Sequence, residues 1–166
     1  SATTTPFLVT LDADTALCPG AVDKALAALA SAGKNAASVC AVAFDIGVKP
    51  SAKAFAELQG LEYDGALNFE RRAQGMVNAI SVCPGAASLW LTQDLREIGG
   101  FSDRSATEDV DATLQLAARG RRTIHVPGAS ALTLVPQTLR QLMSQRQRWC
   151  LGHYQNMLIH WPRRGA

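Results

Sequence analysis

The chain has 166 residues, of which 48% are hydrophobic and 18% are charged. This composition excludes an intrinsically disordered protein and favours one folded domain with a sizeable core. The formal net charge of +2 is too small to predict nucleic-acid binding, although the stretch from Arg140 to Arg164 contains arginines and no acidic residue.

The four cysteines lie far apart and form no CxxC pair, so they predict neither a zinc site nor a dense disulfide framework. A reducing, cytosolic setting fits this pattern. We find no signal peptide and no apolar run that approaches the ~20 residues needed to span a bilayer, so the chain as given is expected to be soluble.

The first half of the chain alternates predicted strands and helices. Pro6–Leu11 is a short apolar run typical of a buried strand. A helix is predicted over Ala21–Ala32, ending at Gly33, followed by a strand over Ala37–Ile46 and a second helix from Ala52 to about Arg72. A buried strand at the start of a chain needs neighbours on both sides in an α/β sheet, so we expect preceding residues to complete that sheet.

The second half is predicted to continue the alternation, which indicates an α/β architecture. A turn at Pro84–Ala86 separates its first two elements. The predicted elements are a strand over Met76–Cys83, helices over Leu91–Ile98 and Glu108–Ala118, a strand over Thr123–Val126, and a long helix from Pro136 to His160.

Asp12-Ala13-Asp14 directly follows the first predicted strand. Two carboxylates at this spacing, at the carboxyl end of a strand, can hold a hard divalent cation against a diphosphate. The alternative is an ordinary turn, because Asp favours turns and helix starts. For an isolated DxD sequence the turn is the more frequent case.

Ser105-Ala-Thr-Glu108-Asp109 fits a capping box in which Ser105 caps the helix and Glu108 bonds back to its amide. Capping does not exclude a catalytic role for Asp109, since a carboxylate in the first helical turn can point into a cleft and accept a proton. The helix dipole would keep this carboxylate ionised, and burial would have to raise its pKa again.

Gln145-Arg146-Gln147-Arg148-Trp149 lies in the last predicted helix, where Gln145 and Trp149 share a face. One interpretation is a solvated basic helix with an aromatic anchor. In the other, Arg148 binds phosphate through its planar fork and Trp149 offers a flat surface to a sugar ring. The spacing leaves both interpretations open.

The combination and order of these motifs resemble processive family 2 glycosyltransferases, which include cellulose, chitin, hyaluronan and poly-N-acetylglucosamine synthases. DAD, TED and QRQRW follow one another at the family's distances, and the resemblance covers nearly the whole chain. The segments Gln59-Gly-Leu-Glu62-Tyr63, Pro84-Gly85-Ala86 and Gly99-Gly100-Phe101 add to it.

The resemblance implies a GT-A fold, an α/β sandwich, in which Asp12 and Asp14 face a Mg²⁺ or Mn²⁺ ion and the nucleotide-sugar, with Asp14 favoured as the direct ligand. It makes Asp109 the general base, with Glu108 in support. Gln145, Arg148 and Trp149 would hold the diphosphate and the acceptor end of the glycan, and Gly85 would lie near the acceptor, although an ordinary turn glycine is an equal alternative. The implied reaction is transfer from UDP-glucose or UDP-N-acetylglucosamine to a growing β-linked polysaccharide, with inversion.

The chain also departs from the family. Relatives often carry a basic residue shortly after the acceptor-loop glycine, where Trp90-Leu91 stands here. They also begin with about a hundred residues, including the first nucleotide-binding strands, before the DxD strand. We therefore expect a partial GT-A fold, inactive alone and able to self-associate through its first strand. The parent would be an inner-membrane protein with this domain in the cytoplasm, and Gln155–Trp161 would approach the membrane surface.

Two other functions compete with this interpretation. A non-catalytic module could retain the fold and bind a glycan or a partner protein, but the intact DAD, TED and QRQRW residues count against it. A metal-dependent hydrolase using the same carboxylates is disfavoured because neither the DAD nor the TED motif contains a His or Cys ligand.

Overall fold

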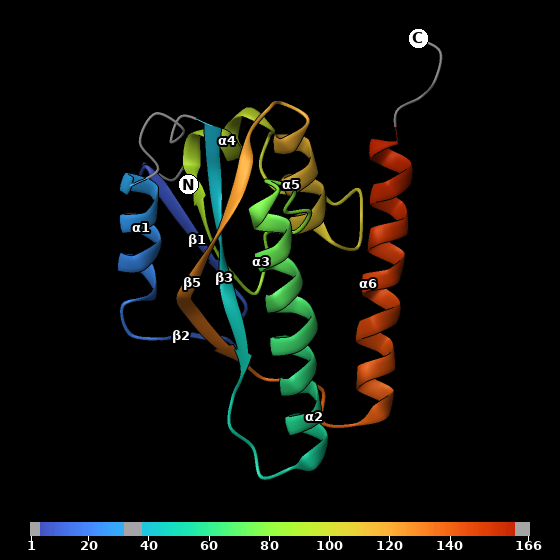
Figure 1. Ribbon diagram of the computed structural model, residues 1–166. Helices are drawn as coiled ribbons and strands as arrows, with labels where there is room; N and C mark the ends of the chain where they lie inside the picture. Colours follow the sequence, from blue (N-terminus) through green and yellow to red (C-terminus); the bar gives the residue numbers. More distant parts are fainter. Residues whose placement is uncertain (1–3, 32–37, 162–166) are drawn as a thin grey trace.

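The computed structural model of the chain describes residues 4–31 and 38–161, which form one mixed sheet with helices packed around it (Figure 1). The strands are β1 (Phe7–Leu11), β2 (Ala16–Leu17), β3 (Val39–Val48), β4 (Ala87–Leu91) and β5 (Arg122–Thr133). The helices are α1 (Ala21–Ser31), α2 (Ala54–Glu62), the π-helical turn η2 (Tyr63–Asn68), α3 (Phe69–Met76), α4 (Thr92–Glu97), α5 (Glu108–Ala117) and α6 (Leu139–His160).

The strand order in the sheet is β1-β4-β3-β5-β2. β3 and β5 are parallel, while β4 is antiparallel to both β1 and β3. β1 therefore lies at one edge of the described sheet, with β4 as its neighbour. The sequence predicted a buried strand here, and the side chains of β1 are instead mostly half-buried.

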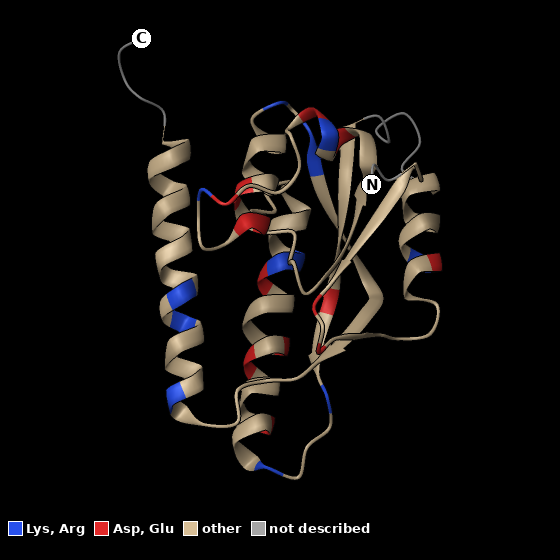
Figure 2. Ribbon diagram, turned by 180° about the vertical axis from the view of Figure 1, so that it is seen from behind, with Lys and Arg blue, Asp and Glu red and all other residues tan. Residues whose placement is uncertain are grey.

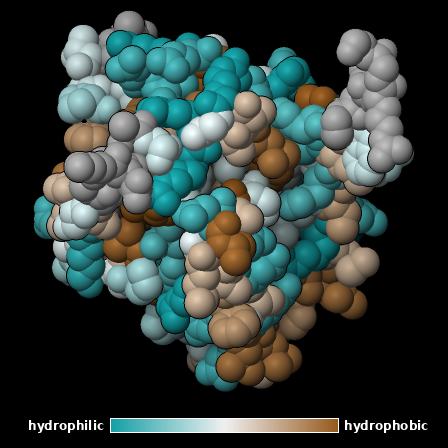
Figure 3. All heavy atoms as spheres, turned by 45° about the horizontal axis from the view of Figure 1, so that its top comes forward, coloured by the Kyte–Doolittle hydropathy of each residue, from teal (hydrophilic) through white to brown (hydrophobic). Residues whose placement is uncertain are grey.

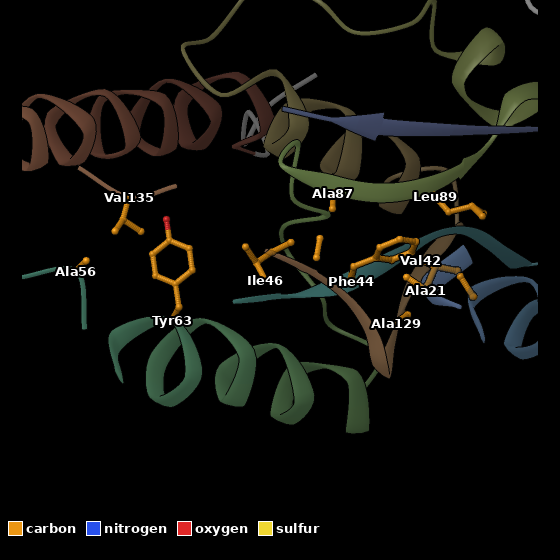
Figure 4. Packing of buried hydrophobic residues seen from close by; sticks show 12 residues of the cluster. Ala21, Val42, Phe44, Ile46, Ala56, Tyr63, Ala87, Leu89, Ala129 and Val135 are labelled. Carbon is orange, nitrogen blue, oxygen red and sulfur yellow. The ribbon is translucent and has the colours of Figure 1, made fainter. Parts of the chain in front are cut away.

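β3 is the centre of the fold because its alternate side chains enter two different core clusters. Val42, Phe44 and Ile46 belong to a cluster that reaches Ala21 of α1 and Tyr63 of η2 (Figure 4). Other residues of β3 pack with β4, α4 and α5 in the second cluster: Cys40, Ala41 and Ala43, with Trp90, Leu95, Ala112 and Leu116. Each fully buried large side chain stabilises the fold by about 1.5–3 kcal/mol.

The predicted helix between Ala52 and Arg72 is confirmed as one continuous helical stretch formed by α2, η2 and α3. Its middle six residues are wound as a π-helix, which the apolar spacing did not predict. Asn68 occupies the end of this turn and is buried, where its side chain bonds both backbone groups of Ile46 in β3. The π-helical turn therefore fastens the helix to the central strand.

The predicted strand over Met76–Cys83 is wrong. Residues 77–83 contain no strand, and Met76 and Val77 are exposed. The strand lies later, at β4, where Ala87–Leu91 pairs with β1 and β3 simultaneously. Pairing partners far away in the sequence decide this element, and local apolar runs do not reveal them.

The remaining predicted elements are confirmed with small shifts at their ends. The helices over 21–32, 91–98, 108–118 and 136–160 correspond to α1, α4, α5 and α6. The strand predicted over Thr123–Val126 is part of the longer β5, which continues past a glycine, Gly128, with φ of 80°. Residues 32–37, which include the predicted end of the first helix and the start of the second strand, lie outside the described residues.

α1 lies on one side of the strands in Figure 1, and α3, α5 and α6 lie on the other. Viewed from behind, the arginines of α6 gather in one half of that helix (Figure 2), and they are Arg140, Arg146 and Arg148. Apolar side chains also reach the surface in groups (Figure 3), and many of the most exposed ones belong to α2, α3 and α6. Within residues 4–31 and 38–161, no helix has the length and apolarity needed to cross a membrane.

Candidate active site

A cavity of about 400 Å³ lies between the end of β1, the η2–α3 helix, the start of α5 and the face of α6. The residues predicted from the sequence motifs all line this cavity. They are Asp12, Asp14, Gly85, Glu108, Asp109, Gln145, Arg148 and Trp149. The fold therefore brings together side chains that are more than 130 positions apart in the chain.

The loop after β1 is held in a fixed shape by backbone and threonine contacts. The amide of Asp12 donates to the carbonyl of Ala86 at 3.2 Å, beside the start of β4. Asp14 accepts a hydrogen bond from Thr133 of β5 at 3.2 Å, and the hydroxyls of Thr15 and Thr133 are 2.8 Å apart. Both Asp12 and Asp14 remain exposed to the cavity.

Asp12 lies in a strongly negative environment. Burial raises the pKa of its carboxyl above the usual Asp value, and the charges of Asp14, Asp109 and Glu108 raise it further, while Arg148 lowers it. Carboxylates that repel one another in this way offer a favourable place for a cation.

The described residues contain no group of three or more His, Cys, Asp and Glu side chains arranged to hold a metal ion. Asp12 and Asp14 supply two carboxylates, which is the protein share typical of Mg²⁺ sites that complete their shell with water and substrate phosphate. The donor chemistry therefore fits a divalent cation that binds together with a diphosphate.

Asp109, the second residue of α5, is held by two backbone amides. One carboxylate oxygen accepts from the amide of Gly85 at 2.8 Å, and the other from its neighbour Val110 at 2.9 Å. Burial raises the pKa of Asp109 above its ordinary value, although these two hydrogen bonds lower it in part. A half-buried carboxylate with a raised pKa is a better proton acceptor than a fully exposed one.

Gly85 contributes its amide to Asp109 and is not required on steric grounds. A Cβ atom added there would lie 3.5 Å from the Asp109 carboxylate, which is ordinary van der Waals contact. The contact with Asp109 therefore does not explain why a glycine stands here. The resemblance implies a different reason, which is the close approach of the backbone to a bound sugar.

The predicted capping box at the start of α5 is wrong. The helix begins at Glu108 after Thr107, and no side chain caps it. The Ser105 hydroxyl instead donates to the carbonyl of Thr107 at 2.9 Å. The loop is held by α6 instead, because the side chain of Asn156 donates hydrogen bonds to Ser105 and Thr107.

α6 packs closely on this loop because Gly152 has no side chain. A Cβ atom at Gly152 would lie only 2.3–2.8 Å from the side chain of Thr107. Further along the helix, His160 bonds the buried carboxylate of Asp111 at 2.7 Å. α6 and the start of α5 are therefore interlocked, which fixes Asp109 relative to the arginines of α6.

Gln145, Arg148 and Trp149 of α6 face the cavity from the other side. Arg148 is exposed, and one of its nitrogens donates to the carbonyl of Ala106 at 3.4 Å. Trp149 is half-buried, and the guanidinium of Arg146 covers its ring at 4.3 Å from the centroid. The motif thus presents a cation and an aromatic surface, while the Oε1 atom of Gln145 is buried without a hydrogen-bond partner in the described part of the chain.

The sequence motifs missed several residues of the cavity wall. Tyr63, Leu67, Glu70, Arg71 and Gln74 all line it from the η2–α3 helix. Their spacing of four, three, one and three positions places them on one helical face, which is a signal that the sequence did contain. Of these residues, only Tyr63 belongs to a segment that carries the family resemblance.

The mixed sheet with helices around it has the architecture of a GT-A fold. The solved structure of a mannosyltransferase from Pyrobaculum calidifontis, in complex with GDP-Man and Mn²⁺, aligns with a TM-score of 0.66. At 18% identity the alignment covers 95% of this chain and 39% of that one. This likeness concerns the fold alone and agrees with the GT-A fold expected from the sequence.

The chain belongs to glycosyl transferase family group 2, whose family model matches residues 7–166. Poly-β-1,6-N-acetyl-D-glucosamine synthase of Staphylococcus aureus (strain COL) is 29% identical over 102 residues, covering 61% of this chain and 25% of that protein. The synthase of Staphylococcus epidermidis is 28% identical over 107 residues, covering 64% and 26%. The chain thus spans about a quarter of the length of these curated relatives.

Proposed function

We propose that the chain is the metal- and acceptor-binding part of a catalytic domain that transfers a sugar from a nucleotide-sugar to a growing β-linked polysaccharide. The observation that carries the proposal is the meeting of three groups in one cavity. These are the carboxylate pair after β1, the half-buried carboxylate of Asp109, and the arginine and indole of α6. Membership of the glycosyltransferase family supports the same chemistry.

Asp109 is the general base of the proposed reaction. The acceptor hydroxyl oxygen forms a bond to the anomeric carbon of the donor, and its proton passes to the Asp109 carboxylate. The bond between that carbon and the diphosphate oxygen breaks, and the diphosphate leaves with the electron pair. The amides of Gly85 and Val110 hold the carboxylate in one orientation for this proton transfer.

The leaving diphosphate is bound on the side of Asp12, Asp14 and Arg148. A Mg²⁺ or Mn²⁺ ion bound by the two aspartates would neutralise the negative charge of the diphosphate. Arg148 adds two parallel donors of fixed geometry. Trp149 offers its half-buried ring to the acceptor sugar, and the exposed Glu108 adds negative charge beside the base.

The donor is UDP-N-acetylglucosamine or UDP-glucose, and the relatives named as poly-β-1,6-N-acetyl-D-glucosamine synthases favour the first. Because the chain spans about a quarter of those proteins, we assign the activity to the full-length enzyme that contains it. The parent is an inner-membrane protein with this domain on its cytoplasmic side. We expect the isolated chain to be inactive.

The test uses the full-length protein that contains this chain, assayed for labelled sugar transfer from both donors with Mg²⁺ or Mn²⁺. Asp109→Asn and Asp14→Ala should each lower the rate by at least about 10²-fold, the usual contribution of a general base or a charge-stabilising group. The matched control is Asp103→Asn, at an exposed aspartate of the loop before α5, which should keep the wild-type rate.

Asp109→Asn should also leave the thermal unfolding temperature unchanged or higher at neutral pH. The folded-state pKa of Asp109 is raised, so its stabilising contribution is complete below the unfolded-state pKa and is lost as pH rises through the folded-state value. Ionised Asp109 therefore does not stabilise the fold at neutral pH. Unimpaired synthesis in either cavity variant would overturn the proposed function.

A further inference from the structure

The inner face of α3 presents a buried cation, Arg71, to the cavity. Arg71 is only 7% exposed and lines the cavity wall. The Nη1 atom donates to the carbonyl of Phe44 and to the side chain of Asn68, each at 3.3 Å. In the described part of the chain, no carboxylate forms an ion pair with this guanidinium.

Two nitrogens of Arg71, Nε and Nη2, make no hydrogen bond to any described residue. Neither belongs to the fully enclosed polar atoms that lack a partner, so both reach open space. Because the residue lines the cavity, these nitrogens are available to a ligand bound there. A buried, unpaired cation costs folding free energy unless another group satisfies it, which indicates a ligand with acceptor oxygens.

The structure holds this guanidinium in a fixed position before any ligand binds. Asn68, which receives one of its bonds, is clamped to β3 through both backbone groups of Ile46, at 3.1 and 3.0 Å. Asn68 ends the π-helical turn η2, and single π-helical turns inside α-helices are frequent at functional sites. The turn thus sets the direction of the Arg71 side chain three residues later.

Arg71 lies close enough to Asp109 for the two charges to interact. Burial lowers the pKa of Arg71, and nearby Cys83, Asp45, Glu70 and Asp109 raise it again. Asp109 also acts on Asp12, which Arg148 of α6 stabilises in its charged form. The cavity therefore contains two cations, from α6 and from α3, and the proposed function assigns the diphosphate to the first.

We infer that Arg71 is a sugar-binding residue whose Nε and Nη2 atoms donate to an oxygen atom of the acceptor sugar beside Asp109. This inference rests on the proposed function. A hydroxyl, ring or amide carbonyl oxygen is a suitable acceptor for these two donors. This hydrogen bond orients the acceptor sugar so that its attacking hydroxyl lies next to Asp109. A water molecule that hydrolyses the donor is not oriented by Arg71.

The experiment compares sugar transfer with donor hydrolysis in the full-length enzyme. Arg71→Gln and Arg71→Lys are assayed with varied concentrations of a short oligosaccharide acceptor, and nucleotide release is measured with and without that acceptor. The efficiency of transfer should fall about 10–100-fold in Arg71→Gln, as expected for the loss of a charged hydrogen bond. The KM for the donor and the rate of hydrolysis should stay at their wild-type values, so the ratio of hydrolysis to transfer rises.

Arg72→Gln is the matched control, because Arg72 is the neighbouring arginine, is about half exposed and pairs with Asp45 outside the cavity. Its kinetic constants should equal those of the wild type. Arg71→Lys keeps the charge but loses the planar fork, so it should recover only part of the transfer efficiency.

Each other result contradicts the inference. An unchanged ratio of hydrolysis to transfer, or a rise in the donor KM alone, would show that Arg71 does not bind the acceptor. Failure of both Arg71 variants to fold would assign the residue to the protein core. Absence of any transfer by the wild-type enzyme would instead overturn the proposed function, so the two failures are distinguishable.

Discussion

The surroundings of Asp109 suit it to the proposed role of general base. Its position at the start of α5 lets two backbone amides hold both carboxylate oxygens, while burial raises its pKa. An aspartate at the start of a helix ordinarily remains ionised, because the helix dipole favours negative charge there. In this chain burial is the largest influence, and it adds basicity at the position where the proposed reaction needs it.

The pH dependence of kcat follows from this raised pKa. The base accepts a proton only when it is ionised, so kcat should fall as pH decreases through the folded-state pKa of Asp109, at a pH above the ordinary aspartate value of ~3.9. The charge of Glu108 contributes to the increase, so Glu108→Gln should move this acid limb to lower pH. The measurement is kcat against pH for both proteins. If kcat instead falls at the ordinary aspartate pKa, or falls at a higher pH in Glu108→Gln, Asp109 is not the base.

At the scale of the elements, the interlock between α6 and the loop before α5 positions the site. Gly152 allows the approach, and Asn156 fixes the loop through its hydrogen bonds to Ser105 and Thr107. Asp111, fully buried, receives bonds from Arg104 as well as from α6. The motifs on the two elements therefore act as one rigid unit.

Gly152→Ala should disturb this unit. The added Cβ would lie 2.3–2.8 Å from Thr107, so α6 or the loop must shift, and overpacking of this kind costs about 1–3 kcal/mol. We expect a lower unfolding temperature together with a lower kcat in the full-length enzyme. The control is Gly60→Ala, at a helical glycine where a Cβ would meet Val48 at 3.9 Å, and which should be neutral or stabilising by up to about 1 kcal/mol. Equal effects of the two changes would argue against the interlock.

The sequence predicted the helices better than the strands because helices depend on local spacing. The apolar face of α5 and the length of α6 follow from residues a few positions apart. β4 was missed because its pairing with β1 and β3 joins segments some 50 to 80 positions apart. The capping box failed for a related reason. Ser105, which was expected to cap α5, instead donates to the carbonyl of Thr107 and accepts a hydrogen bond from Asn156, far away in the sequence.

For the site, the motifs predicted which residues meet but not how they are held. Their order along the chain carried the family resemblance, and the fold then brought them to one cavity. The sequence did not predict Arg71 as a site residue, because an arginine on a helix is ordinarily solvated. Only the tertiary contacts with Phe44 and Asn68 make it a buried group.

At the scale of the whole molecule, the described sheet has β1 at its edge, directly before the carboxylate pair. The cavity is walled by η2–α3, α5 and α6. The chain spans a quarter of its curated relatives, so we assign the complete reaction to the full-length enzyme. In the proposed function, residues of this cavity would supply the base, the metal-binding carboxylates and the acceptor contacts of that enzyme.

The stereochemistry of the transferred sugar tests this assignment most directly. A single displacement on an α-linked nucleotide-sugar, with Asp109 as the base and no covalent enzyme intermediate, inverts the anomeric carbon. Labelled product made by the full-length enzyme should therefore be released by a glycosidase specific for β-linkages and resist one specific for α-linkages. A product with α-linkages, or no transfer from either UDP-N-acetylglucosamine or UDP-glucose, would contradict the proposed function.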